Sequence, residues 1–193
     1  MTGQINVNKI AARTGTTINM ESGHKILMPG SIVQTKSFTM TSTTTTTSDG
    51  FVDTGLQLAI TPSSASSKIL ITGHICVGGS YFKTYIRLLR GSTVLSVGDA
   101  ASNRPQVYAG SHPGGSDWDA YAVTPIPLNL LDSPNTTSSV TYKVDFRPYQ
   151  HTATTSYINR SASDRDNADY DERSISVMTL QEIAQWVQYL LII

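Results

Sequence analysis

The chain has 193 residues, and its 14 Lys plus Arg balance its 14 Asp plus Glu, so that the formal net charge is zero. A zero balance excludes nucleic-acid or membrane-surface binding driven by bulk charge. Threonine (25) and serine (23) make up a quarter of the residues, whereas charged residues are only 15%. Such a chain is poor in strong helix formers and rich in strand and turn formers, which predicts an all-β fold.

Cysteine content and hydropathy exclude internally disulfide-linked, multi-cysteine zinc and membrane-spanning proteins. Cys76 is the single cysteine, which rules out an internal disulfide and a multi-cysteine zinc site, and its apolar surroundings predict a buried strand residue. The longest apolar run, Leu190–Ile193, is far shorter than the roughly 20 residues of a membrane-spanning helix. The N-terminus lacks the basic and then apolar pattern of a signal peptide. We therefore expect synthesis in a cytosol, without membrane insertion.

Residues 1–30 form a first segment that glycines divide into short pieces. Between the glycines, apolar and polar residues alternate with period 2, which is typical of short β-strands. Two-stranded pieces of this kind are marginal in water, so the segment is expected to order against another protein or other copies of itself. A frayed N-terminal arm is the alternative. The assembly candidates in this segment are Ile5, Val7, Ile10 and Ile18.

Residues 31–185 contain many strand-like runs separated by Gly, Pro and Ser turns, without a sustained 3.6-residue period. This pattern predicts a β-sandwich of the jelly-roll type. The expected strands are 32–41, 50–61, 68–77, 81–90, 93–97, 106–109, 120–124, 126–131, 140–147, 154–159 and 174–183. The threonine tract 41–48 is either an extended edge strand, which we favour, or a connector.

The clearest local element is a hairpin over residues 81–97. Gly91-Ser92 stands between two β-rich runs and fits a two-residue type II′ turn, which requires glycine first. Alternation places Phe82, Thr84, Ile86 and Leu88 on one face and Lys83, Tyr85, Arg87 and Leu89 on the other, wetter face.

Residues 186–193 form an abruptly apolar third segment. Exposed apolar side chains in such a run are an aggregation hazard, so the segment is expected to be covered by its own domain or by a neighbouring copy. The assembly candidates here are Trp186, Val187, Tyr189 and Leu190.

A search for catalytic chemistry finds no assembled pattern. The four histidines match no H-x-x-x-H or H-E-x-x-H arrangement, and no G-x-S-x-G, Walker or G-x-G-x-x-G motif is present. We therefore expect a non-enzymatic protein without a cofactor, and His74 is expected to be a structural strand histidine.

An acidic run over residues 163–172 offers the hard oxygen ligands that Ca²⁺ uses, from Asp164, Asp166, Asp169 and Asp171. The spacing fails for an EF-hand, because position 6 is Asp169 where glycine is required. Arg160, Arg165 and Arg173 also partly neutralise the run. A solvated loop without metal is the favoured interpretation, and a non-EF calcium site is the alternative.

The most binding-like stretch is the loop over residues 111–121. It combines the aromatic rings of Trp118 and Tyr121 with the carboxylates of Asp117 and Asp119, after flexible glycines. Aromatic faces beside carboxylate acceptors suit sugar recognition, whereas a tryptophan packed over the end of the sandwich is equally compatible. Tyr149, His151, Tyr157 and Asn159 could add to the same surface.

Two parts of the chain resemble a known class of proteins. The run Ile5-Asn-Val-Asn-Lys-Ile-Ala-Ala-Arg-Thr-Gly-Thr-Thr-Ile-Asn-Met-Glu-Ser-Gly-His-Lys-Ile, with Pro29-Gly-Ser-Ile-Val-Gln34, resembles a segment of tail-fibre and other virion proteins of tailed bacteriophages, those of marine and cyanobacterial phages above all. The runs 81–95 and 174–183 are similar to jelly-roll head domains of such fibres. The resemblance implies a homotrimer with an N-terminal stem and a β-sandwich knob, and it carries over no functional residue.

The first hypothesis is therefore a trimeric, fibre-like element of a phage tail in the virion, made in the host cytoplasm. Its N-terminal segment would bind other virion proteins, and its head loops would contact a host-surface glycan. A capsid or tail cement protein without receptor binding is the first alternative. A carbohydrate-binding module is the second, although paired carboxylates for glycan hydrolysis are not evident.

Overall fold

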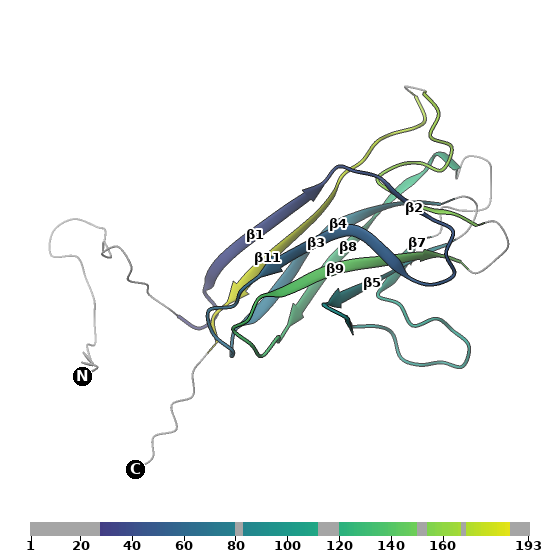
Figure 1. Ribbon diagram of the computed structural model, residues 1–193. Helices are drawn as coiled ribbons and strands as arrows, with labels where there is room; N and C mark the ends of the chain where they lie inside the picture. The colour runs from purple at the N-terminus through teal and green to yellow at the C-terminus, as the bar shows by residue number, and fades with distance from the viewer. Residues whose placement is uncertain (1–27, 80–82, 112–119, 150–153, 167–168, 186–193) are drawn as a thin grey trace, which may run out of the picture.

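The computed structural model describes residues 28–79, 83–111, 120–149, 154–166 and 169–185 (Figure 1). The described residues form short and long β-strands joined by turns. The strands are β1 (Ile32–Met40), β2 (Thr44–Thr46), β3 (Val52–Ile60), β4 (Lys68–Gly79), β5 (Thr84–Arg90), β6 (Thr93–Leu95), β7 (Ala109–Ser111), β8 (Val123–Asp132), β9 (Val140–Pro148), β10 (Ser156–Ile158) and β11 (Ser176–Ile183).

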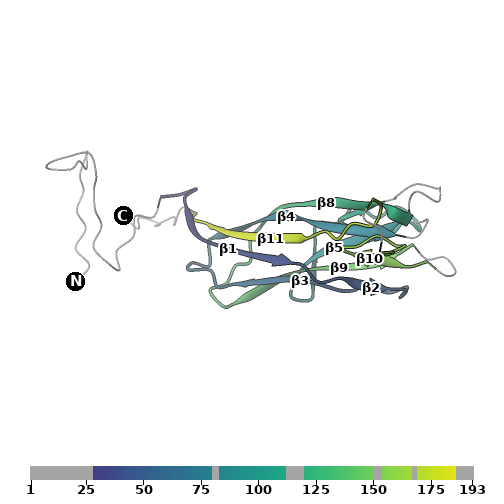
Figure 2. The same ribbon diagram turned by 90° about the horizontal axis from the view of Figure 1, so that it is seen from above.

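The strands form two antiparallel sheets that pack face to face as two layers (Figure 2). The first sheet has six strands in the order β1-β11-β4-β10-β2, and β8 pairs with the other side of β4. The second sheet has five strands in the order β3-β9-β5-β6, with β7 also paired to β5. The protein is thus an all-β sandwich, as the composition predicts.

The strand pairs are nested, and the nesting defines the topology. β5 pairs with β6 and β7, β4 pairs with β8, β3 pairs with β9, and β1 pairs with β11, so that each outer pair encloses the next. Rolling such a nested antiparallel ribbon into two sheets produces two Greek keys, the topology of a jelly roll. The predicted jelly-roll type of sandwich is therefore confirmed.

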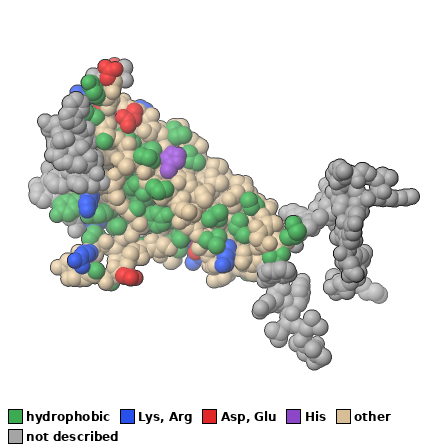
Figure 3. Space-filling view, turned by 180° about the vertical axis from the view of Figure 1, so that it is seen from behind, with side chains coloured by type: hydrophobic (Ala, Val, Ile, Leu, Met, Phe, Trp, Pro, Cys, Tyr) green, Lys and Arg blue, Asp and Glu red, His purple; other side chains and the backbone are tan. Residues whose placement is uncertain are grey.

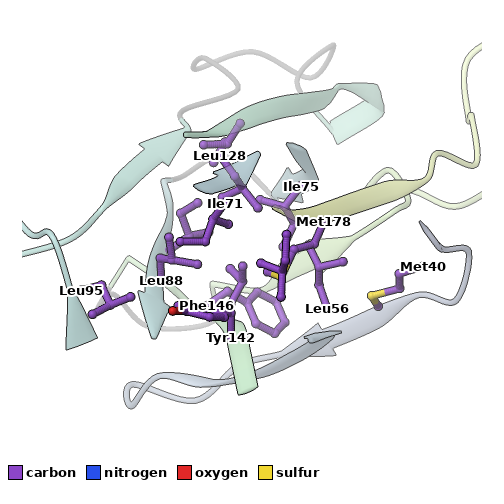
Figure 4. Close-up of a cluster of buried hydrophobic side chains, with 14 of the residues drawn as sticks. Met40, Leu56, Ile71, Ile75, Leu88, Leu95, Leu128, Tyr142, Phe146 and Met178 are labelled. Atoms are coloured by element: carbon purple, nitrogen blue, oxygen red, sulfur yellow. The ribbon is translucent and has the colours of Figure 1, made fainter. Parts of the chain in front are cut away.

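The core lies between the two sheets and is built from the inward side chains of both. Tyr142, Phe146, Leu56, Ile71 and Met178 are fully buried within it (Figure 4). Burying one side chain of this size stabilises the fold by about 1.5–3 kcal/mol. The hydroxyl of Tyr142 donates to Asp132 Oδ2 at 2.7 Å, and burial with this bond raises the pKa of Tyr142.

The predicted hairpin is confirmed in its described part. Leu88, Leu89 and Arg90 pair with Leu95, Val94 and Thr93, which leaves Gly91 and Ser92 as the two-residue loop. Gly91 has a φ of 58° and Ser92 has no positive φ, as a type II′ turn requires. Thr84, Ile86 and Leu88 face the core, as predicted, while Leu89 is buried on the outer face.

One predicted break between strands is wrong. Residues 120–124 and 126–131 were expected to be separate strands, but β8 runs continuously from Val123 to Asp132, through Pro125. Among the described strands β8 pairs only with β4, so Pro125 lies on an edge strand, where no second ladder bond is needed. The threonine tract does contain an edge strand, β2, which is three residues long.

Candidate functional site

Both ends of the described chain meet at one end of the sandwich. The Gly30 N–H donates to the carbonyl of Ala184 at 2.8 Å, and the Ala184 N–H donates to the carbonyl of Ser31 at 2.9 Å. We call this end the proximal pole. β7 ends and β8 begins at the opposite end, the distal pole (Figure 1).

An aromatic–arginine cluster, made of Tyr121, Arg165, Tyr170 and Asp171, occupies the distal pole. The guanidinium carbon of Arg165 lies 4.3 Å from the ring centroid of Tyr121 and 5.9 Å from that of Tyr170. The two tyrosine rings are tilted by 39°, with centroids 5.7 Å apart. Tyr170 is 45% exposed, so part of its side chain faces solvent. Tyrosine offers an apolar face and a hydroxyl, which together suit contact with a sugar.

The carboxylate of Asp171 fixes the loop that carries this cluster. It accepts hydrogen bonds from Ser161 Oγ at 2.7 Å and from Ser163 Oγ, and it pairs with Arg165 Nε at 2.9 Å. The hydrogen bond from Ser163, with those from Ser161 and Arg165, outweighs burial and lowers the pKa of Asp171 to about 2. The same ion pair raises the pKa of Arg165. The cluster is therefore held in its charged form at neutral pH.

Backbone contacts bring the two predicted loops together. The carbonyl of Ala120 accepts hydrogen bonds from the N–H groups of Ala162 and Ser163, at 2.9 and 3.0 Å. This contact joins the end of the predicted glycan loop to the acidic run, 42 or more positions later in the sequence. It explains why Tyr121 lies against Arg165 and Tyr170.

A second cluster of ion pairs connects the residues at the two ends of the acidic run. Arg160 and Arg173 form an isolated antiparallel bridge, and both pair with Asp164, at 2.5 and 2.6 Å. The guanidinium of Arg160 also lies 4.5 Å from the ring centroid of Tyr157. Neighbouring arginine side chains thus form ion pairs with the carboxylates of Asp164 and Asp171.

The calcium candidates do not converge as a ligand set. Asp164 and Asp171 belong to two separate arginine-paired clusters, and Asp166 is exposed. In the part of the chain that the structure describes, no group of three or more His, Cys, Asp or Glu side chains could hold a metal ion.

The structure describes Tyr121 of the predicted glycan loop, whereas it leaves the other residues of that site and the assembly candidates undescribed. Tyr121 is half-buried in the aromatic–arginine cluster. Several candidates lie outside the described residues: Asp117, Trp118 and Asp119 of the glycan loop, His151, and the assembly candidates Ile5, Val7, Ile10, Ile18, Trp186, Val187, Tyr189 and Leu190.

Two predictions about polar strand residues have definite outcomes. Asn159 was a possible addition to the surface of the 111–121 loop, but it is fully buried, where its amide donates to the carbonyls of Met40 and Ser42 and its oxygen accepts from Ser176. It therefore joins strands and does not contact a partner. His74 is a structural residue as predicted, with Nε2 3.2 Å from the carbonyl of Ile175.

Sequence reasoning missed the roles of Arg165 and Tyr170. It treated Arg165 as a neutralising charge and did not pair it with Tyr121, because 44 positions separate them in the sequence. The sequence feature that pointed to this contact was the presence of an arginine and a tyrosine within one acidic loop.

Cys76 is buried, as predicted, and burial raises the pKa of its thiol. None of the described residues belongs to a helix with the length and hydropathy that a membrane span needs.

Comparisons with known proteins give a distant likeness of fold. No family model matches the chain, and no curated protein matches it significantly. A chain in the structure of the infectious bursal disease virus Gt strain is similar over 88% of this chain and 42% of that chain, with 11% identity and a TM-score of 0.39. The Gx strain structure (10% identity, TM-score 0.36) covers the same shares, and the T=1 particles derived from that virus (10% identity, TM-score 0.34) cover 88% and 41%. The present chain spans less than half the length of these solved chains.

Proposed function

We propose that the protein is a non-enzymatic structural component of a virion, a trimeric, fibre-like element of a bacteriophage tail. Its N-terminal segment attaches to other virion proteins, and its β-sandwich head contacts the host cell surface. One observation carries the proposal: the described chain enters and leaves at the proximal pole, through Gly30, Ser31 and Ala184, while the aromatic–arginine cluster with the exposed Tyr170 lies at the distal pole. A body fixed at one end and recognising a target at the other needs this polarity.

The jelly roll suits this role because it connects the two poles rigidly. β4 and β8 pair over ten positions, from Ile69 to Gly78, along the length of the sandwich. Of the residues that the structure describes, eighteen buried hydrophobic ones pack between the sheets as one cluster. Such a core holds the distal ends of the strands in a fixed geometry relative to the attachment end.

The target in this proposal is a surface glycan. Tyr121 and Tyr170 supply aromatic faces, and Trp118, Asp117 and Asp119 stand in the loop that ends at Tyr121. Aromatic rings stack on the C–H faces of sugars, and carboxylates accept hydrogen bonds from sugar hydroxyls. The supporting contact is the Tyr121–Tyr170 pair, with centroids 5.7 Å apart.

Cell binding tests the receptor role. Fluorescently labelled wild-type protein is expected to bind cells of the phage host, and Trp118→Ala and Tyr170→Ala to reduce binding at least about tenfold. Phe38→Ala is a matched control, because Phe38 is also an exposed aromatic but lies on edge strand β1. Binding by both Trp118→Ala and Tyr170→Ala at the wild-type level would contradict glycan recognition by these side chains.

A capsid or tail cement protein is the second candidate. It is favoured by exposed apolar side chains at the proximal pole, where Met28 is 61% and Ile32 is 54% exposed. Gold-labelled antibody against the protein distinguishes the two in electron micrographs of particles. Label at the tail extremity supports the fibre, whereas label over the capsid, together with no cell binding, supports cement.

A further inference from the structure

Arg147, near the end of β9, carries a buried guanidinium that forms no ion pair within the described residues. Only 8% of the residue is exposed. In the same part of the chain, its one hydrogen bond runs from Nη1 to the carbonyl of Pro148, at 3.5 Å. Charged side chains are seldom buried without a partner of opposite charge, because removing the charge from water is costly. The guanidinium is therefore a candidate site for an anion.

Two aromatic rings flank this guanidinium. Arg147 is the direct cross-strand partner of Tyr85 on β5, and Phe51 directly precedes β3, on the other side of β9. The guanidinium carbon lies 5.0 Å from the ring centroid of Phe51 and 5.2 Å from that of Tyr85. Both aromatic residues are half-buried, so part of each faces solvent. We call Phe51, Tyr85 and Arg147 together the Arg147 slot.

The neighbouring charges on the same face already pair with one another. Lys143 lies 3.5 Å from Asp53 and 3.6 Å from Asp145, and Arg87 pairs with Asp145 at 3.4 Å. With Arg147, this group contains three cations and two carboxylates. One positive charge is therefore in excess, and it belongs to the side chain that forms no ion pair among the described residues.

The slot lies at the distal pole, on the outer face of the five-stranded sheet. The pair Tyr85–Arg147 is adjacent to the pair Thr84–Pro148, and Thr84 also pairs with Ser111 at the end of β7. The outer face of the other sheet is different in kind. Viewed from behind, hydrophobic and uncharged side chains surround the histidine of β4, and charged side chains lie towards the borders (Figure 3).

The shape of the slot favours a carboxylate over other anions. The guanidinium is planar, and its N–H donors form a fork that the two oxygens of a carboxylate can accept together. Rings on both sides leave the plane of the guanidinium as the direction of approach. A planar carboxylate fits that plane, whereas the additional oxygens of a tetrahedral sulfate or phosphate would meet the rings. A carboxylate also supplies the single negative charge that balances the group.

We propose that the Arg147 slot binds the carboxylate of an acidic sugar in a host-surface glycan. The inference rests on the proposed function, from which it takes the contact between the distal pole and a glycan. Arg147 forms a two-pronged ion pair with the carboxylate, and Phe51 and Tyr85 supply apolar surface for the C–H groups of the same sugar. The slot thus selects for charge, which the tyrosine pair at Tyr121 and Tyr170 does not.

A glycan array tests the inference with the full chain. The array carries glycans that end in uronic or sialic acids, each beside its carboxyl-reduced form, in which a hydroxymethyl group replaces the carboxylate. Wild-type protein is expected to bind the acid forms at least about tenfold more tightly than the reduced forms. Arg147→Lys keeps the charge but loses the planar fork, so this variant is expected to lose the preference.

Arg104→Gln is the matched control, because Arg104 is an exposed arginine of the loop between β6 and β7. It removes one positive charge from the protein and should keep the wild-type preference. If Arg147→Lys lowers the melting temperature, Phe51→Leu removes one wall of the slot without changing the charge, and it should weaken binding of the acid forms.

Three outcomes would overturn the inference. Equal binding of acid and reduced glycans by the wild-type protein would do so, and so would a wild-type preference in the folded slot variant; either result leaves glycan recognition at the distal pole intact. Binding to no glycan of the array also overturns the inference. In that case the binding of labelled protein to host cells decides separately whether the proposed receptor role holds.

Discussion

The carboxylate of Glu182 accepts hydrogen bonds from both the N–H and the hydroxyl of Ser63, at 2.8 and 2.6 Å, across 119 positions of sequence. Glu182 is fully buried near the end of β11, and Gln34 Nε2 on β1 donates to it at 2.6 Å. One side chain thus ties the last strand, the first strand and the turn between β3 and β4 together at the proximal pole.

Glu182→Ala is expected to lower the free energy of unfolding by about 3 kcal/mol. The loss follows because the donors of Gln34 and Ser63 stay partly buried without an acceptor, and each such group costs about 1–3 kcal/mol. Urea denaturation followed by circular dichroism measures the change. Glu172→Ala is the matched control, since Glu172 is exposed, and it should be nearly neutral. Equal losses in both variants would show that the buried network does not stabilise the fold.

Protonation of Glu182 in acid is expected to lower the free energy of unfolding. Burial alone raises the pKa of Glu182, but hydrogen bonds from Gln34, Ser63 and Ser67 outweigh it and hold the pKa below its ordinary value. A carboxyl whose pKa is lower in the folded state stabilises the fold above its ordinary pKa, and this contribution is lost as pH falls through the folded value. The free energy of unfolding is therefore expected to decrease below about pH 4.5.

Glu182→Gln keeps the shape and the acceptor oxygen but cannot titrate. Its unfolding free energy should depend less on pH in that range than the wild-type value, and parallel curves for the two proteins would contradict the assignment. Asp171, with its pKa at about 2, contributes a further loss at still lower pH.

Gly73→Ala should destabilise the fold by at least about 3 kcal/mol. Gly73 has a φ of 142°, and a Cβ there would lie 2.0 Å from the carbonyl oxygen of Val177. The strand β11 would have to move away from β4. Gly98→Ala is the control, because a Cβ at Gly98 meets nothing within 4 Å. Thermal denaturation of both variants provides the comparison, and similar melting temperatures would refute the close approach of the two strands.

Calcium is expected neither to bind to the acidic run nor to stabilise it. Arginines 160, 165 and 173 already pair with the carboxylates of Asp164 and Asp171, so that the ion would have to displace them. Titration calorimetry should give no saturable heat, and the melting temperature should not change with added Ca²⁺. Saturable heat that disappears in Asp171→Asn would establish the non-EF calcium site instead.

Deletion of residues 186–193 is expected to weaken assembly or solubility. The segment contains Trp186, Val187, Tyr189 and Leu190, and burial of such apolar area against sister copies stabilises an oligomer. Sedimentation of the truncated and full-length chains at equal concentration measures the effect. Unchanged mass and unchanged solubility would show that this segment has no part in assembly.

Composition and local pattern were sufficient for the fold class and for much of the strand order along the chain. The alternation in residues 84–89 predicts which side chains face the core, and Gly91-Ser92 predicts the turn, because both depend on neighbours within a few positions. The burial of Cys76 also follows from its apolar run.

Only the tertiary structure decided which distant residues meet. Pro125 is compatible with a continuous β8 because that strand is at an edge, and edge position depends on strand order, which local pattern does not encode. The contact of Tyr121 with Arg165 and Tyr170 requires the hydrogen bonds from Ala162 and Ser163 to Ala120. The nested pairing of the jelly roll likewise places β8, β4, β11 and β1, which come from all along the chain, side by side in one sheet.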